Sequence, residues 1–345
     1  MVEEERVVLR PRYHLLNEGC GNGPINIFFA GAGFNFKLAH DVGVRKRLLS
    51  WHANPKEEID QAIRHDIEVG DTFLICDSGA FTAWNKGDEI DVEEYGERLL
   101  ELLKYFDVAA NLDVIPGKKG MPAKSITKEM TDRAAGDGWR NYLKLSDILS
   151  ANGISPSRLM PIYHQGESMD WLKKMVDHGC DYIGISPSND YRTSQRQIWL
   201  DDVFDYLASL PVMPKTHGYA VTAPVLMGQF AWYSVDSASW VQLGGYGCVN
   251  TPYGPVTMTD RKDIMSKPDS LHGRNWSKEM RLQLERYFDR LGLDIEKLKA
   301  DYKERWKANA KYWLEIERSL KYKRRHRPEP IFGQIGEVPM TMHGQ

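Results

Sequence analysis

Phe73-Leu74-Ile75-Cys76-Asp77-Ser78-Gly79-Ala80-Phe81 joins a short apolar run to a polar turn that contains glycine. An apolar run of this length indicates a strand that is covered on both faces, as strands of parallel sheets usually are. The aspartate and the glycine that follow are residues that end a strand and begin a turn. The same arrangement recurs along the chain, and its recurrence predicts the fold.

Short apolar runs alternate with helical patterns over most of the chain. The runs lie at 25–30, 72–76, 108–112, 159–163, 182–185 and 232–235, with weaker candidates at 47–51 and 212–216. Helical spacing of apolar residues lies between several of them, for example after Asp91, where Glu94 completes a capping box. Alternating strands and helices predict an α/β protein with a parallel sheet, and roughly 240 residues of this pattern fit a TIM-like (β/α)8 barrel.

A doubly wound sheet is the competing fold. It usually carries a glycine-rich phosphate loop after its first strand, and Gly31-Ala32-Gly33 does follow the first apolar run. No third glycine completes the dinucleotide motif, so we expect a tight turn there.

Composition sets the domain plan and the cellular setting. The chain has 345 residues, with 42% hydrophobic and 27% charged residues and a net charge of -3, which argues against coating nucleic acid through bulk charge but allows a local basic patch. We expect a barrel domain over 1–265, a helical, basic C-terminal extension over 276–327 and a tail over 328–345. The acidic beginning is unlike a signal peptide and no apolar run is long enough to span a membrane, which predicts a cytoplasmic protein without a membrane partner.

The cysteines favour neither zinc nor disulfides. Cys20, Cys76, Cys180 and Cys248 form no closely spaced pair, so we expect reduced thiols and no structural zinc.

Polar residues follow the predicted strands, where a barrel places its active site. They are Asp77, Asp113, His164-Gln165-Gly166, His217 and Asp236. Two carboxylates in one small pocket suit chemistry at an acetal-like carbon, where one attacks the anomeric carbon and the other moves a proton on the leaving group. A carboxylate such as Asp113 and a carboxamide such as Gln165 together match the hydrogen-bonding edge of a guanine-like base.

At these residues the chain resembles the tRNA-guanine transglycosylase (queuine tRNA-ribosyltransferase) superfamily. The segment 77–81 is similar to that family's DSGGF segment, which implies Asp77 as general acid/base and Phe81 as a stacking face for the base. Ser234-Val235-Asp236-Ser237 lies where the family carries its nucleophilic aspartate, so the resemblance implies that role for Asp236.

Three further segments resemble the family's base-binding parts. Asp113-Val114-Ile115-Pro116 is similar to the segment of its base-recognition aspartate, and His164-Gln165-Gly166 to its QGG segment, which implies substrate contacts by Asp113, Gln165 and Gly166. Tyr182-Ile183-Gly184 resembles the strand whose glycine backbone contacts the base. From its position at a strand end, we add His217 as a candidate for pocket contact.

Departures from the family favour one of its branches. The chain lacks the cysteine-rich zinc motif of the cellular tRNA enzymes, and it looks closest to phage-type members that place 7-deazaguanine bases into DNA. The resemblance implies a glycosyltransferase that exchanges a guanine in DNA for a 7-deazaguanine base through an Asp236-linked intermediate, with no cofactor or metal. It would act in the host cytoplasm if it is phage-encoded. The same exchange on tRNA, a non-catalytic nucleic-acid-binding protein and a base-releasing hydrolase are the alternatives.

Basic residues near the site are candidates for phosphate contacts. They are Lys118 and Lys119 in the stretch 117–138, Arg192 and Arg196 after the strand at 182–185, and Lys323, Arg324 and Arg325 near the C-terminus. The stretch 117–138 could equally be a solvated loop, and 321–327 a solubilising tail. A homodimer or a helper protein is a possible partner.

Overall fold

The computed structural model describes residues 11–19, 23–31, 35–117, 120–121, 125–188, 191–259, 271–272 and 277–323. The candidate phosphate contacts Lys118, Lys119, Arg324 and Arg325 lie outside these ranges, as do Cys20, the predicted domain boundary at 265 and the tail from 328.

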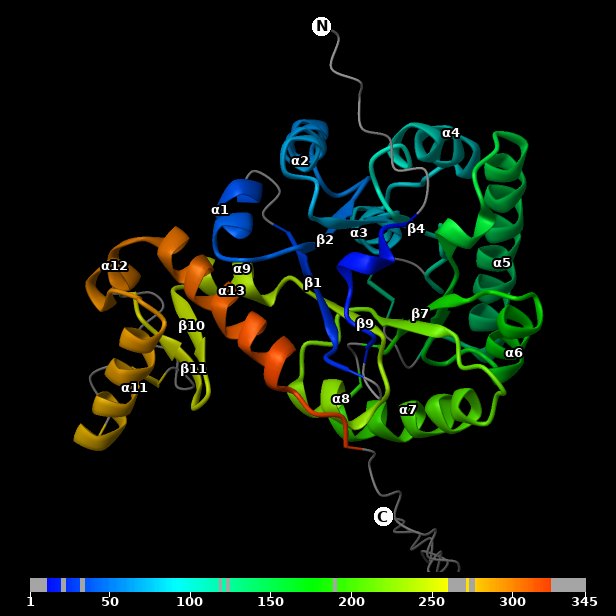
Figure 1. The fold of residues 1–345 in the computed structure, drawn as a ribbon. Coiled ribbons are helices and arrows are strands. Elements are labelled where there is room, and N and C mark those ends of the chain that lie inside the picture. Colours follow the sequence, from blue (N-terminus) through cyan, green and yellow to red (C-terminus); the bar gives the residue numbers. More distant parts are fainter. Residues whose placement is uncertain are drawn as a thin grey trace, which may run out of the picture.

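A parallel sheet forms the centre of the protein (Figure 1). Its strands are β1 (Asn26–Ala30), β2 (Lys46–Ser50), β3 (Phe73–Asp77), β4 (Val108–Ala110), β5 (Leu159–Met160), β6 (Ile162–His164), β7 (Tyr182–Ser186), β8 (Lys215–Gly218) and β9 (Ser234–Ser237). They are ordered β5-β4-β3-β2-β1-β9-β8-β7-β6. Every apolar run predicted from the sequence overlaps one of these strands.

The two ends of this nine-stranded sheet are consecutive pieces of chain. Pro161 alone separates β5, which pairs with β4, from β6, which pairs with β7. Leu159 and Tyr163 both pack toward the helices while Met160 packs inside, so the alternation of faces continues through the proline. The sheet is therefore barrel-like and nearly closed.

Helices surround the sheet (Figure 1). They are α1 (Phe36–Asp41), α2 (Lys56–Val69), α3 (Ala80–Lys86), α4 (Val92–Leu102), α5 (Lys128–Ala151), α6 (Met169–Asp177), α7 (Thr193–Ala208), α8 (Pro224–Gln229) and α9 (Ser239–Gly245). Helix α4 begins as predicted, because the Asp91 side chain accepts hydrogen bonds from the backbone N–H groups of Glu93 and Glu94.

The interpretation of 117–138 as a solvated loop is wrong from Lys128 onward. Lys128 and Arg133 lie on α5, whose N-cap is Thr127. Gly136 and Gly138 lie inside this helix and weaken its sequence signal, since glycine is a poor helix former. Gly138 is nevertheless buried, and a Cβ there would contact the backbone of Val114, so its small size lets α5 pack closely on the chain after β4.

Side chains on the strands alternate between two cores. Residues that face the helices join one large cluster, whereas Phe28, Phe73, Ile75 and Tyr182 belong to the cluster inside the barrel. Because side chains two apart on a strand share a face, Asp77 extends the interior row of Phe73 and Ile75 to the carboxyl end of β3.

A second, smaller unit lies beside the barrel (Figure 1). A sheet of β10 (Cys248–Thr251), β11 (Gly254–Thr257) and β12 (Leu271–His272), which the sequence did not predict, packs with α11 (Lys278–Arg290) and α12 (Ile295–Ala300) around its own core. Helix α13 (Tyr302–Ser319) returns to the barrel, where Ala310, Trp313 and Leu314 join the large cluster. The predicted C-terminal helices are thus present, and the last of them packs on the barrel.

The described cysteines Cys76, Cys180 and Cys248 are free thiols. Within the described ranges, no helix combines the length and the apolar character needed to cross a membrane.

Candidate active site

Three carboxylates meet at the carboxyl end of the barrel. Asp77 is the last residue of β3, Asp236 lies in β9, and Asp113 follows β4. Burial raises the pKa of Asp77 to about 7, and the negative charges of Asp113 and Asp236 contribute to the increase. Asp77 can therefore carry a proton near neutral pH and release it, as a general acid/base must.

A tight turn holds the Asp77 carboxylate. The Gly79 N–H donates to Asp77 Oδ2 at 3.0 Å, and a side-chain hydrogen bond from Ser50 partly opposes the rise in the Asp77 pKa. Gly79 has a φ of +83°, and a Cβ at this position would lie 2.6 Å from Ser50 Oγ. Glycine in the DSGAF segment is therefore needed both for the left-handed turn and for the close approach of β2.

Asp236 is held by a strained turn. Its side chain is only slightly exposed, and its Oδ1 accepts a hydrogen bond of 2.8 Å from the Ala220 N–H. Ala220 has a φ of +50°, and no other non-glycine residue in the described part of the chain has a positive φ. Such backbone is costly for alanine and is often found at functional sites. Here it directs an N–H group at the Asp236 carboxylate and holds that carboxylate in place.

His217 lies behind Asp236 in the barrel. The ring is fully buried, its Nε2 is 3.6 Å from Asp236 Oδ1, and its Nδ1 is 2.7 Å from Ser234 Oγ. The Tyr182 hydroxyl is 2.5 Å from the same Ser234 oxygen. The arrangement links β7, β8 and β9 beneath the nucleophile candidate. Substrate contact by His217 stays a prediction, since the structure shows it among protein groups.

Asp113 is paired with a histidine that the sequence did not single out by itself. His164 Nε2 lies 2.9 Å from Asp113 Oδ2. Burial lowers the pKa of His164, but the hydrogen bond and charge of Asp113, together with the charge of Glu167, outweigh burial and raise it overall. Burial also raises the pKa of Glu167 to about 7. His164 is the last residue of β6 and shares the interior face with Ile162, in agreement with the strand-end position predicted from the sequence, which assigned it no role of its own.

Gln165 and Gly166 follow His164 at the rim. Gln165 Oε1 accepts from the Ser188 N–H at 3.1 Å, which ties the loop after β6 to the loop after β7. Gly166 is exposed and has a φ of +107°, a conformation that favours glycine. Both residues lie at the same end of the barrel as the aspartates.

Gly184 lies beneath an aromatic ring. Its N–H donates to the Pro161 carbonyl at 2.8 Å and is therefore used within the sheet. A Cβ on Gly184 would lie 2.6 Å from Cε2 of Tyr219. The glycine thus makes room for Tyr219, a residue that the sequence interpretation missed although it lies two positions after His217, on the same face of the chain.

The remaining candidates divide between the two ends of the barrel. Phe81, at the start of α3, is 59% exposed and stacks on Trp84, with ring centroids 6.2 Å apart. Arg192 is exposed before α7, and Arg196 donates from Nε to the Tyr191 carbonyl at 3.0 Å. These three follow strands β3 and β7, so they lie on the side of the aspartates.

Lys323 lies toward the opposite end. Its N–H donates to the carbonyl of Gly228 in the last turn of α8, and α13 reaches this end with Glu317, which accepts from the Ile27 N–H near the start of β1. Lys46, the first residue of β2, donates to the same glutamate at 2.6 Å. The structure therefore does not bring Lys323 together with the aspartates.

No protein-family model matches the chain, and no curated protein matches it either. Among the residues that the structure describes, no three His, Cys, Asp or Glu side chains are grouped so that they could hold a metal ion.

Proposed function

We propose that the protein is a guanine transglycosylase that exchanges a guanine in DNA for a 7-deazaguanine base by double displacement. The observation that carries this proposal is the unequal setting of two carboxylates at one barrel mouth. Both carboxylates accept a backbone hydrogen bond, but burial and acidic neighbours raise the pKa of Asp77 to about 7, whereas the strained turn at Ala220 holds Asp236. Such a difference separates a proton carrier from a nucleophile.

In the first displacement Asp236 attacks C1′ of the target nucleoside. The glycosidic bond breaks, its electron pair leaves with guanine, and Asp77 donates its proton to the departing base. In the second displacement Asp77 removes the proton from the incoming 7-deazaguanine, whose nitrogen attacks C1′ and expels Asp236. Two inversions retain the β configuration, and atoms and charges balance without a redox cofactor.

The fold supports this assignment. If β5 and β6 are counted as one strand interrupted by Pro161, the sheet has the eight parallel strands of a TIM-like (β/α)8 barrel. In such barrels, catalytic residues come from the carboxyl ends of different strands. Asp77, Asp113 and Asp236 follow that arrangement.

Base recognition falls to the groups around Asp113. The pairing with His164 at 2.9 Å orients its carboxylate, and Gln165 lies on the adjoining loop. Phe81 offers an exposed ring on which a base can stack. A target guanine in duplex DNA must leave the stack to reach these groups, at a cost of a few kcal/mol.

Labelled guanine tests the proposal. Purified protein should incorporate it into DNA in preference to tRNA, and Asp236→Asn should abolish incorporation while nucleic-acid binding remains, because phosphate contacts dominate affinity. Asp170→Asn is the matched control, since Asp170 is exposed on α6.

Each other outcome favours one alternative. Incorporation into tRNA alone would assign the tRNA reaction, and release of guanine without incorporation would assign a hydrolase. Binding without exchange on either nucleic acid would indicate the non-catalytic protein. Mass spectrometry of nucleosides from cells that express the protein would identify the inserted base.

A further inference from the structure

The Tyr219 hydroxyl is an unexplained buried donor at the centre of the site. It is inaccessible to solvent, and no described group is hydrogen-bonded to it. Burying a polar group without a partner costs about 1–3 kcal/mol, so each such case asks for an explanation. The explanation must come from what surrounds the hydroxyl.

Three carboxylates act on this hydroxyl electrostatically, but none of them accepts a hydrogen bond from it. Burial raises the pKa of Tyr219 well above its usual value, and the charges of Asp77, Asp113 and Asp236 add to this effect. The phenol therefore stays protonated at any pH at which the protein would work, and it can act as a donor. None of the three aspartates is its acceptor.

The ring is fixed in place by its neighbours. The backbone N–H of Tyr219 donates to the Ile185 carbonyl at 3.0 Å. The Tyr219 ring lies on Gly184, and the centroid of the His217 ring is 4.9 Å away in an edge-to-face contact. The next residue is Ala220, whose strained backbone directs its N–H at Asp236. One turn thus positions both the nucleophile and the donor, which is the preorganisation that catalysis requires.

We propose that Tyr219 is a further catalytic residue, whose hydroxyl donates a hydrogen bond to the base that is being exchanged. This inference rests on the proposed function. As the glycosidic bond breaks, its electron pair spreads over the ring nitrogens and the carbonyl oxygen of the departing guanine. Among three carboxylates that negative charge is unfavourable, and a neutral donor offsets it. In the second displacement, the same donor stabilises the negative charge of the incoming base after Asp77 has removed its proton.

Tyr219→Phe tests the hydroxyl alone, because the ring remains on Gly184. The rate of guanine release in a single turnover should fall by about 10²–10³-fold, the usual effect of removing one donor from a developing negative charge. Nucleic-acid affinity should stay unchanged. Tyr246→Phe is the control, since Tyr246 is an exposed tyrosine outside the site.

A second readout distinguishes chemistry from a structural role. DNA that carries 8-azaguanine has a better leaving base, which needs less stabilisation, so the deficit of Tyr219→Phe should shrink to about 10-fold or less. An equal deficit with both bases would mean that the hydroxyl serves structure, and it would overturn the inference. Wild-type release in Tyr219→Phe would overturn it as well while leaving the proposed function intact, whereas no release by the wild type would overturn the function itself.

Gly184→Ala provides an independent variant should Tyr219→Phe fold poorly. The new Cβ would lie 2.6 Å from the Tyr219 ring and must displace it. The displaced hydroxyl should no longer reach the departing base. The loss in the release rate should therefore again be smaller with DNA that carries 8-azaguanine than with DNA that carries guanine. A Gly184→Ala protein that folds and releases guanine at the wild-type rate would contradict the role of Tyr219.

Discussion

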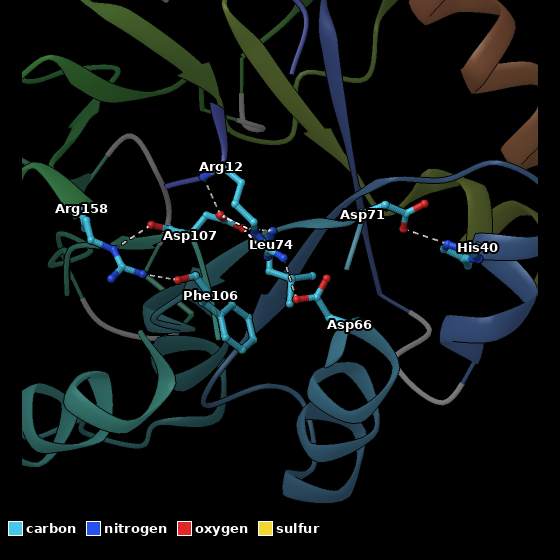
Figure 2. Close-up of polar contacts among 8 residues, drawn as sticks. All are labelled: Arg12, His40, Asp66, Asp71, Leu74, Phe106, Asp107 and Arg158. Atoms are coloured by element: carbon cyan, nitrogen blue, oxygen red, sulfur yellow. Dashed lines mark hydrogen bonds and ion pairs between the residues drawn. The ribbon is translucent and has the colours of Figure 1, made fainter. Parts of the chain in front are cut away.

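The two ends of the barrel both bury charged side chains, but in opposite ways. At the amino end, Asp107 accepts from Arg12 through the backbone N–H and through Nε, each at 2.8 Å, and through Nη2 at 2.7 Å. It also accepts from the Leu74 N–H at 2.9 Å, while Arg12 Nη1 reaches Asp66 at 2.8 Å (Figure 2). Arg158 donates to the Asp107 carbonyl at 3.0 Å, and the opposite charges of Arg12 and Asp107 compensate each other.

At the carboxyl end, like charges face one another. Asp77 lies near Asp113 and Asp236, the Tyr219 hydroxyl has no described partner, and Ala220 has strained backbone. Such arrangements cost stability and are found where a site has been arranged for function. The difference shows that burial of charge by itself does not identify a site; the informative feature is the burial of like charges close to one another.

The largest expected effect on stability is at the amino end. Asp107→Ala leaves Arg12 buried without its main partner and removes the acceptor of four hydrogen bonds. The free energy of unfolding, measured with denaturant, should fall by about 3–5 kcal/mol. Exchange per folded molecule should stay near the wild-type rate.

Asp41→Asn is the matched control, because its ion pair with Lys37 is exposed and should contribute little. If Asp107→Ala and Asp41→Asn were equally stable, the buried contacts of Asp107 would not stabilise the amino end of the barrel.

Asp77→Asn should change the free energy of unfolding in the opposite direction and stabilise the folded protein at high pH. A carboxylic acid whose pKa is raised on folding binds its proton more tightly in the folded state, so stability falls as the pH rises from about 4, the unfolded value, to about 7, the folded value. Above that window the variant, which cannot ionise, should be more stable than the wild type by about 2–4 kcal/mol. Below the window the difference should disappear.

Activity should move the other way in the same variant. Exchange by Asp77→Asn should drop by about 10²–10⁴-fold, the usual worth of a positioned proton carrier. Denaturation at pH 5 and pH 8 together with exchange assays measures both effects. If the variant were less stable than the wild type at pH 8, ionised Asp77 would not be destabilising the folded protein at the carboxyl end of the barrel.

Asp113→Asn should change base choice more than rate. An amide presents a donor where guanine also presents one, and it loses the charge that pairs with His164. Discrimination between guanine and bases that lack its N–H donors should fall by about 10–100-fold, the worth of one charged hydrogen bond. Competition between labelled bases measures the ratio. Unchanged discrimination would remove Asp113 from base recognition.

The smallest expected effects are at surface cations. Arg192 lies on the side of the aspartates, and Arg192→Ala should weaken nucleic-acid binding uniformly across sequences. The slope of log affinity against log salt concentration should fall by about 1, the value for one lost phosphate contact. Lys323→Ala should change neither quantity, since Lys323 lies toward the amino end. Binding measured over a range of salt concentrations compares them. If Lys323→Ala lost more nucleic-acid affinity than Arg192→Ala, the nucleic acid would bind at the amino end of the barrel.

Much of the barrel could be predicted because it is local in the sequence. Each strand is a short apolar run, and the residue just past it falls on the mouth, which is how Asp77, Asp113 and Asp236 were found. The sequence interpretation does not predict helix α5, because glycines interrupt its pattern although packing favours them.

Other features depend on contacts that a single sequence does not display. Arg12 meets Asp107 across 95 positions of chain, and neither residue stands out in the sequence. Tyr219 became a candidate only when its ring was seen on Gly184 and its hydroxyl among three carboxylates. The sequence thus predicts which residues end strands, and three-dimensional packing decides which of them lack partners.

The most direct test of the central claim is the covalent intermediate. Protein is incubated with its DNA in the absence of an incoming base, denatured, and examined by mass spectrometry for a nucleic-acid adduct. Wild type and Asp170→Asn should form a denaturation-resistant species linked through Asp236, and Asp236→Asn should form none. An adduct of undiminished yield in Asp236→Asn, or exchange by the wild type with no adduct under any condition, would contradict double displacement through Asp236.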